Sequence, residues 1–326
     1  MPASVDILTA TAVSALVSFL GFWIYRRWAV TGVMLDHPGP RSSHLYSTPT
    51  GAGIVIIAAV QVSAWLLPAL RPEYSMAIHL ATGLGLLGFV DDRRNLPVGF
   101  RLLVQASLVC LFLTLNRPML PMSELSVGYE LGILAGGLLL LLWLINLFNF
   151  MDGIDGIAST QACFLSIAYL VVFTSDVAGG PLVLVAASAA VFFLAFNRAP
   201  ATLFMGDSGS LFLGGLLAFF GALLVFSEHA ALPAVLILWA SFVADATVTL
   251  IKRSWRGEAP WRAHKEHFYQ HLAQRLRSHS KVSILYSAVN ILWLLPLALI
   301  AHGWPQFASI ALIAAYLPLV LIASRW

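Results

Sequence analysis

The stretch Asn146-Leu147-Phe148-Asn149-Phe150-Met151-Asp152-Gly153-Ile154-Asp155-Gly156 decides how the rest of this chain is interpreted. It follows an apolar run over 131–145, and its Asn and Asp side chains recur every three residues, an interval that places them on one broad side of a helix. The two glycines disfavour one continuous helix, so we expect the backbone to bend here. Carboxylates at the mouth of a membrane helix are costly and indicate a cation or an ionic substrate, whereas the alternative is a solvated acidic helix end.

The composition is that of a membrane protein. The 326 residues are 60% hydrophobic and 10% charged, with a mean hydropathy of +0.87, whereas soluble domains carry roughly 25% charged residues. Apolar runs recur from end to end, which predicts an all-α, polytopic integral membrane bundle that forms a single domain over 1–326. The net charge of +3 does not by itself indicate nucleic acid, and we expect no such partner. Cys110 and Cys163 lack metal or redox spacing.

The apolar runs predict about eleven transmembrane spans, of which the third is short and the first is a retained span rather than a signal peptide. Of the 18 Lys and Arg residues, 16 fall on the side of the loops that follow odd-numbered spans, and Arg71 and Arg117 fall on the other. The positive-inside rule then predicts an N-terminus outside and a C-terminus in the cytoplasm. The expected spans are 6–25, 50–70, 76–90, 101–116, 129–147, 158–174, 181–197, 211–226, 232–251, 283–301 and 307–324.

Most residues suited to chemistry lie in the five loops that this topology places in the cytoplasm. We therefore expect one active site on the cytoplasmic face, assembled from several loops. The two halves show no obvious inverted repeat, a pattern that would have favoured a transporter. The loops are 26–49, 91–100, 146–157, 197–210 and 252–282.

Acidic residues of these loops, facing Arg, Lys and His, indicate a divalent cation and phosphates. Mg²⁺ takes oxygen ligands and typically uses one or two carboxylates together with substrate phosphates. For each acid the alternative is structural, a solvated helix end or a glycine turn. The run Gly206-Asp207-Ser208-Gly209-Ser210 before a helix also offers backbone N–H groups to phosphate. The candidate ligands are Asp91, Asp92, Asp152, Asp155 and Asp207.

Three histidines in the last loop, His264, His267 and His271, have spacings that place them on one helical face. A zinc site usually has further fixed ligands and outer-shell partners, so phosphate contact is the better interpretation for histidines surrounded by Arg and Lys. For His271 and His279 we expect a surface amphipathic helix instead.

Four ordered motifs resemble the polyprenyl-phosphate N-acetylhexosamine-1-phosphate transferases, the glycosyltransferase 4 type. They are Asp91-Asp92, the segment 149–156, the segment 204–210 and His264-Lys265-Glu266-His267. The first-loop residues 36–38, 41–44 and 48–49 are similar to the branch that begins O-antigen or other surface-glycan intermediates. The phospho-N-acetylmuramoyl-pentapeptide translocase belongs to the same superfamily.

The resemblance implies a role for each matching residue. Asp207 matches the acid most directly associated with Mg²⁺ (Mn²⁺ is a substitute), and Asp152 and Asp92 are further expected ligands. Asp91 and Asp92 match the pair that positions the metal or activates the lipid phosphate, and the cluster of Asn149, Asp152 and Asp155 lies beside the sugar nucleotide. Phe204 matches the ring that stacks on uracil, and His264 and His267 lie near the diphosphate. Arg41, Ser42 and Arg253 are the remaining expected substrate contacts.

The implied reaction moves N-acetylhexosamine 1-phosphate from a UDP-N-acetylhexosamine to undecaprenyl phosphate and releases UMP, in a bacterial inner membrane, as in lipopolysaccharide biosynthesis. Asn95 stands where the pentapeptide translocase has Lys, and Lys265-Glu266 interrupts the histidine motif, so both departures disfavour that branch. A transporter that uses intramembrane acids and histidines is the competing class. Membrane lipids are expected partners, and a homodimer is left open.

Overall fold

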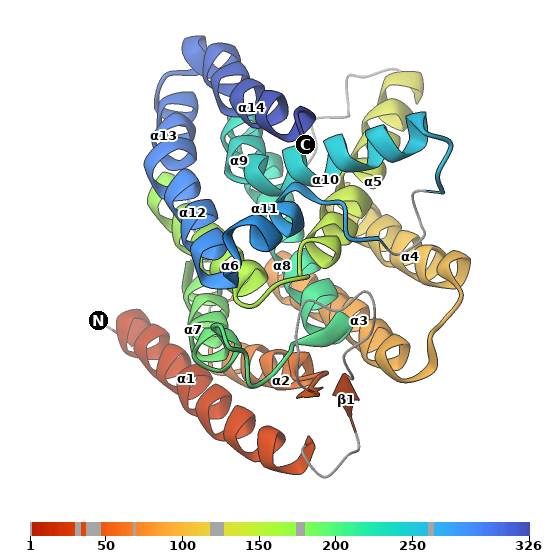
Figure 1. Cartoon of the computed structure of the whole chain (residues 1–326). Helices are drawn as coiled ribbons and strands as arrows, with labels where there is room; N and C mark the ends of the chain where they lie inside the picture. The colour runs from red at the N-terminus through yellow and green to blue at the C-terminus, as the bar shows by residue number, and fades with distance from the viewer. Residues whose placement is uncertain are drawn as a thin grey trace.

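The computed structural model describes residues 2–29, 34–36, 47–67, 70–117, 127–173, 180–259 and 264–326. As the apolar runs predict, the chain is a bundle of helices (Figure 1), with one short antiparallel pair, β1 (Leu35–Asp36) and β2 (Thr48–Pro49). The helices are α1 (Pro2–Ala29), α2 (Gly53–Ala64), α3 (Pro72–Arg94), α4 (Val98–Asn116), α5 (Val127–Phe150), α6 (Ile157–Val172), α7 (Gly180–Asn197), α8 (Gly206–Ser227), α9 (Leu232–Leu238), α10 (Ala240–Trp255), α11 (Phe268–Leu276), α12 (His279–Val289), α13 (Leu295–Gly303) and α14 (Ala308–Ser324).

Each of the eleven expected spans falls on helix, but length and composition support fewer of them as complete crossings. In the described part of the chain, six helices are long and apolar enough to cross a membrane, and a seventh crossing results if α9 and α10 form one span bent by 69°. α2, α6 and the described part of α7 are apolar but shorter, which accounts for most of the difference. The chain is therefore a polytopic membrane bundle with six or seven candidate spans.

The third expected span, 76–90, is longer than its apolar run indicates. α3 has 23 residues, begins with Pro72 in its first turn and continues through a polar last turn to Asn95, which ends it in a left-handed conformation (φ 48°). Proline suits the first turn of a helix because the N–H it lacks would have no partner there. The extra turn carries Asp91 and Asp92 beyond the apolar part of the helix.

α8 forms the centre of the bundle (Figure 1). Within its most apolar window 83% of the residues are buried, against 17–28% for the other unbent candidate spans. Small residues let its neighbours approach closely: a Cβ on Gly53 of α2 would lie 2.0 Å from the Gly209 nitrogen, and one on Gly88 of α3 would lie 2.2 Å from the Asp207 carbonyl oxygen. Close crossings at small residues are typical of membrane helices. They bring the end of α3 against the start of α8.

The bend between α9 and α10 is packed around Trp239, which is fully buried. Its indole N–H donates to the Tyr169 hydroxyl at 2.8 Å, and its ring lies edge-on to Phe148 of α5. Tyr and Trp polar groups generally find a partner when they are buried. These contacts fix the direction in which α10 leaves the bend.

Candidate active site

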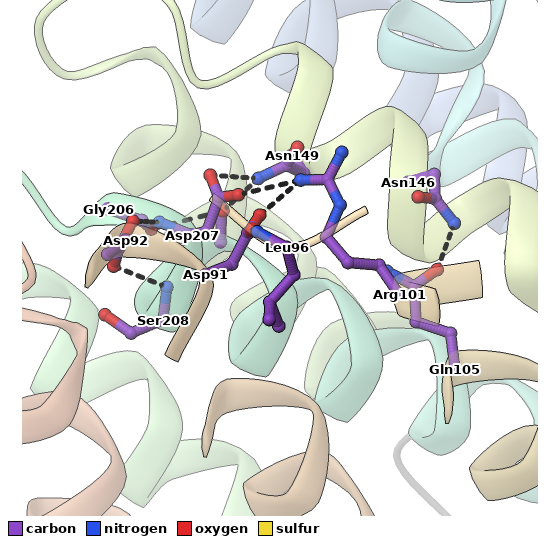
Figure 2. Close-up of polar contacts among 11 residues, drawn as sticks. Asp91, Asp92, Leu96, Arg101, Gln105, Asn146, Asn149, Gly206, Asp207 and Ser208 are labelled. Carbon is purple, nitrogen blue, oxygen red and sulfur yellow. Dashed lines mark hydrogen bonds and ion pairs between the residues drawn. The ribbon is translucent and has the colours of Figure 1, made fainter. Parts of the chain in front are cut away.

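The last turn of α3 holds the first turn of α8 (Figure 2). Asp92 Oδ1 accepts a hydrogen bond from the Asp207 N–H at 2.9 Å, and Asp92 Oδ2 accepts one from the Ser208 N–H at 3.2 Å. The first N–H groups of a helix lack partners within it, so the Asp92 carboxylate caps α8 from a neighbouring helix. Gly206, at φ +70°, permits this contact, because a Cβ there would lie 2.5 Å from Asp92 Oδ2.

Asp91 is buried and already paired with a cation. Its Oδ1 accepts from the Leu96 N–H at 2.6 Å, and its Oδ2 forms an ion pair with Arg101 Nη1. The same Arg101 nitrogen lies 3.4 Å from Asp207 Oδ2 (Figure 2). In the sequence, Arg101 stands at the start of the expected span 101–116 and belongs to no motif that marks it as a site residue. An arginine at the end of an apolar run often extends to the membrane surface, so its position alone does not indicate a site residue.

The amides of α5 orient the acid on α8. Asn149 Nδ2 donates to Asp207 Oδ1 at 2.9 Å and to the Ser210 hydroxyl at 2.8 Å. Asn146, one turn earlier, donates to Gln105 of α4 at 2.7 Å and lies farther from the acids (Figure 2). Thus Asn149 and Arg101 contact different oxygens of the Asp207 carboxylate.

The two acids that follow α5 differ in their surroundings. Asp155 Oδ2 accepts from the Ala201 N–H at 3.0 Å and lies 3.3 Å from His279 Nδ1. His279 is the first residue of α12, and its side chain contacts the acidic loop, which the surface-helix prediction did not include.

Asp152 has no hydrogen-bond donor to its carboxylate among the described residues. Burial raises its pKa well above the ordinary aspartate value, and the negative charges of Asp207, Asp92 and Asp155 raise it further. Each of these causes disfavours the ionised form. A cation bound beside Asp152 would stabilise its ionised form.

A cavity of about 610 Å³ collects the predicted acids. Phe204 also lines it, and its backbone is held by the Phe204 N–H donating to the Pro49 carbonyl at 2.8 Å and by the Ala52 N–H donating to the Phe204 carbonyl at 3.1 Å. The volume is within the usual range for small-molecule sites, about 300–1,000 Å³. The predicted site residues that line this cavity are Asp91, Asp92, Asn149, Asp152, Asp155, Phe204 and Asp207.

The donor set in this cavity fits a hard cation with two protein carboxylates. In the described ranges, no three His, Cys, Asp or Glu side chains form a group that could hold a metal ion, so the expected trio of Asp92, Asp152 and Asp207 does not form one. The reason is local, since both Asp92 oxygens face the N–H groups of α8. Asp207 and the uncompensated Asp152 remain, and one or two carboxylates plus substrate phosphates is the usual Mg²⁺ arrangement.

The predicted histidine face does not form, because α11 begins only at Phe268. His264 lies before the helix, His267 is the residue just before its first turn, and their rings are 4.8 Å apart. His267 is buried and its ring stacks on Phe150 at the end of α5, with centroids 6.5 Å apart. Neither histidine lines the acidic cavity.

His264 is a poor cation in this setting. Burial, together with the neighbouring His267 and Arg253, lowers its pKa to about 4. A histidine with that pKa is neutral near pH 7. It can offer a hydrogen bond to a diphosphate but no full charge.

Arg253, an expected substrate contact, is engaged elsewhere. It is buried and forms ion pairs with Glu258 at 2.8 Å and with Glu266. Arg256 also pairs with both glutamates, so the four side chains form one network beside the histidines. The expected contacts Arg41 and Ser42 lie outside the described residues.

Asp245 of α10 supports the segment that carries the histidines, a role that was not predicted from the sequence. Its Oδ1 accepts from the Phe268 N–H at 2.8 Å, and its Oδ2 accepts from the Tyr269 N–H at 2.9 Å and from the Tyr286 hydroxyl at 2.5 Å. It thus caps α11 as Asp92 caps α8. The signal in the sequence is one acid inside the apolar run 232–251. Its position after the bend could not be predicted from that run.

Comparisons with known proteins agree on one family. The profile of glycosyl transferase family 4 matches residues 74–225, which contain the predicted acids of the cavity but not Asp36, which also lines it. A phospho-N-acetylmuramoyl-pentapeptide-transferase from Heliobacterium modesticaldum is 30% identical over 267 residues, 75% of this chain and 80% of the relative. Proteins of the same name from Granulibacter bethesdensis (32% over 290 residues, 76% and 78%) and Clostridioides difficile (30% over 216 residues, 59% and 66%) are also similar.

Proposed function

The chain belongs to glycosyl transferase family 4, and we propose that it is a phosphoglycosyl transferase of the inner membrane of a bacterium. In this proposal it transfers N-acetylhexosamine 1-phosphate from a UDP-N-acetylhexosamine to undecaprenyl phosphate, releases UMP and begins an O-antigen or other surface glycan. The whole chain, 1–326, acts as one membrane domain whose helices make about eleven transmembrane segments, the shorter apolar helices included. Its N-terminus is outside and its active site faces the cytoplasm, as the 16 of 18 basic residues on that side indicate.

The observation that carries this proposal is the pair Asp152 and Asp207 in the acidic cavity. The Asp152 carboxylate accepts no hydrogen bond from the described residues and lies beside three other acids, which is costly without a cation. Carboxylate oxygens are the hard ligands that such a cation prefers. Mg²⁺ bound there would neutralise diphosphate charge and polarise the bond that breaks. A transporter would instead need acids along a path through the membrane, and the named relatives are transferases.

In the proposed reaction, an oxygen of the lipid phosphate attacks the phosphorus that bears the sugar, and the bond from that phosphorus to the UMP oxygen breaks. Phosphoryl transfer depends mainly on positioning and charge neutralisation. Asn149 orients the Asp207 carboxylate, Arg101 places a guanidinium beside it, and Phe204 offers a ring to the uracil. The family resemblance assigns Asp91 to the lipid phosphate. Its ion pair with Arg101 favours a role in positioning charge over removal of a proton.

The second candidate is a phospho-N-acetylmuramoyl-pentapeptide transferase, which the names of the relatives favour. Asn95 and the interrupted histidine motif support the first candidate. Both reactions share the acidic cavity and release UMP, so the cavity does not discriminate between them.

The test is transfer by the purified full-length protein in detergent with undecaprenyl phosphate. Labelled UDP-N-acetylglucosamine, UDP-N-acetylgalactosamine and UDP-N-acetylmuramoyl-pentapeptide are compared, each with Mg²⁺, Mn²⁺ or EDTA. We expect lipid-extractable label and stoichiometric UMP from an N-acetylhexosamine donor, lost with EDTA and in Asp207→Asn. Transfer from the pentapeptide donor alone would establish the second candidate, and no UMP from any donor would reject both.

A further inference from the structure

The end of α14 lies beside α10 and packs against α11 (Figure 1). Lys252 of α10 donates from its ammonium group to the Ala323 carbonyl at 3.1 Å, which gives a partner to one of the last carbonyls of α14. Just beyond, the Trp326 ring centroid is 5.9 Å from that of Phe268 and 4.9 Å from the guanidinium carbon of Arg275. The reaction proposed above assigns no role to these contacts.

The two partners of Trp326 lie on one side of α11. Phe268 is the first residue of the helix and Arg275 is in its last turn, and seven residues are close to two helical turns. His271 lies between them on the same side and, with Phe268 and Trp326, lines a small cavity at this contact. The indole ring therefore packs along most of the length of α11.

The opposite side of α11 faces the acidic cavity. The Tyr269 hydroxyl donates to the Phe150 carbonyl at 3.0 Å, where α5 ends. Gln270 lines the acidic cavity, and its side-chain oxygen accepts the His267 N–H at 3.3 Å. A displacement of α11 would therefore move Gln270 relative to the cavity, together with the segment that carries His267.

Packing must hold α11 in place because the helix is short. It has nine residues, and isolated helices of fewer than about 12–15 residues are marginal in water. The Asp245 cap fixes only its first turn. Trp326 contacts both ends of the helix, and contacts between two aromatic rings, or between a guanidinium and an indole, are favourable beyond the area that they bury.

We propose that Trp326 is a positioning residue, which holds α11 and with it Gln270 against the acidic cavity. Trp326 does not itself line that cavity, so its effect on the reaction passes through α11. The inference rests on the proposed function for its effect on transfer, whereas the effect on α11 can be measured without the reaction.

The experiment uses the full-length protein in detergent. Amide hydrogen exchange of α11 is measured by mass spectrometry, and kcat and KM are measured for the donor that wild type transfers in the test above. The variants are Trp326→Ala and Trp326→Phe, which keeps an aromatic ring. Trp304→Ala is the matched control, because Trp304 is similarly exposed but lies at the other end of α14, where α13 leads into it.

We expect Trp326→Ala to accelerate exchange in α11 by about tenfold, as the loss of one aromatic pair and one cation contact implies. The KM for the donor should rise severalfold while kcat changes little, because donor binding then has to draw α11 back to its place. Trp326→Phe should recover most of both effects, and Trp304→Ala should match wild type.

The outcomes separate this inference from the proposed function. If α11 exchanges as slowly in Trp326→Ala as in wild type, or if Trp304→Ala accelerates it equally, Trp326 does not hold the helix. If exchange accelerates but KM and kcat stay at wild-type values, the contact is structural and the positioning role is overturned. A wild type that transfers no donor rejects the proposed function, and the exchange comparison still decides whether Trp326 holds α11.

Discussion

Asp92 and Asp207 lie on different helices, yet the Asp92 carboxylate accepts the Asp207 backbone N–H at 2.9 Å and so fixes where the Asp207 side chain begins. The neighbouring Ser208 N–H makes the same interaction with the other Asp92 oxygen. An acid that a motif would assign to metal binding is therefore also a helix cap. The two roles predict different effects of Asp92 substitutions on stability and on Mg²⁺ dependence.

Replacing Asp92 by Ala should remove both capping interactions. We expect the free energy of unfolding to fall by about 1–2 kcal/mol, the usual cost of a lost cap, and the Mg²⁺ concentration for half-maximal transfer to rise as Asp207 moves. Asp92→Asn keeps one accepting oxygen and should lose less stability. Thermal unfolding and Mg²⁺ titration of the transfer rate check this. A Mg²⁺ defect in Asp92→Asn as large as that of Asp207→Asn, with wild-type stability, would instead make Asp92 a direct ligand.

Arg101 should be needed for both stability and turnover. Arg101→Gln leaves the buried Asp91 without its cation, and a lost hydrogen bond to a charged group costs about 2 kcal/mol. The double variant Asp91→Asn with Arg101→Gln should recover much of the stability but not the transfer rate. The control is Arg94→Gln, because Arg94 is an exposed arginine at the end of α3, the helix that carries Asp91. A double variant no more stable than Arg101→Gln would show that the two side chains are not coupled.

The raised pKa of Asp152 predicts how stability changes with pH when no metal is bound. Because the folded-state pKa lies above the unfolded value, the contribution of Asp152 to stability is full below about pH 4 and is lost as pH rises through the folded value. In EDTA, Asp152→Asn should therefore be more stable than wild type at pH 8, with a smaller difference at pH 5. Mg²⁺ should raise the Tm of wild type and have little effect on Asp152→Asn. Identical pH profiles for the two proteins would remove this role from Asp152.

The sequence predicted the membrane bundle and the side chains of the acidic cavity because both depend on local patterns. Apolar runs located the helices, and the acids at 91–92, 152–155 and 207 stand at the ends of those runs. Their convergence on one cavity follows from close helix crossings at Gly53 and Gly88, which no periodicity marks.

What the sequence could not predict depends on partners that are distant along the chain. Arg101 pairs with Asp91 and approaches Asp207, and the second of these contacts spans 106 residues. Arg253 looked free for substrate because its glutamate partners, Glu258 and Glu266, carry no pattern that assigns them to it. The histidine spacing predicted that the helix would include His264 and His267. The helix instead begins at Phe268, whose N–H group is capped by Asp245.

Asp245 should control the position of the segment that carries His264 and His267 without contacting the substrate. Its carboxylate accepts two N–H groups of α11 and the Tyr286 hydroxyl, and Tyr269 in turn donates to the Phe150 carbonyl, next to the acidic loop. Asp245→Ala leaves these buried donors without an acceptor, which should cost about 3 kcal/mol.

The matched variant is Tyr286→Phe, which removes one donor and keeps the helix cap, at about 1 kcal/mol. We expect Asp245→Asn to accelerate amide hydrogen exchange at Phe268 and Tyr269 and to lower turnover, whereas Tyr286→Phe should change neither by much. Exchange measured by mass spectrometry, together with the transfer rate, tests this. If turnover is lost in Asp245→Asn while both amides remain as protected as in wild type, Asp245 acts on the reaction by a route other than the position of α11.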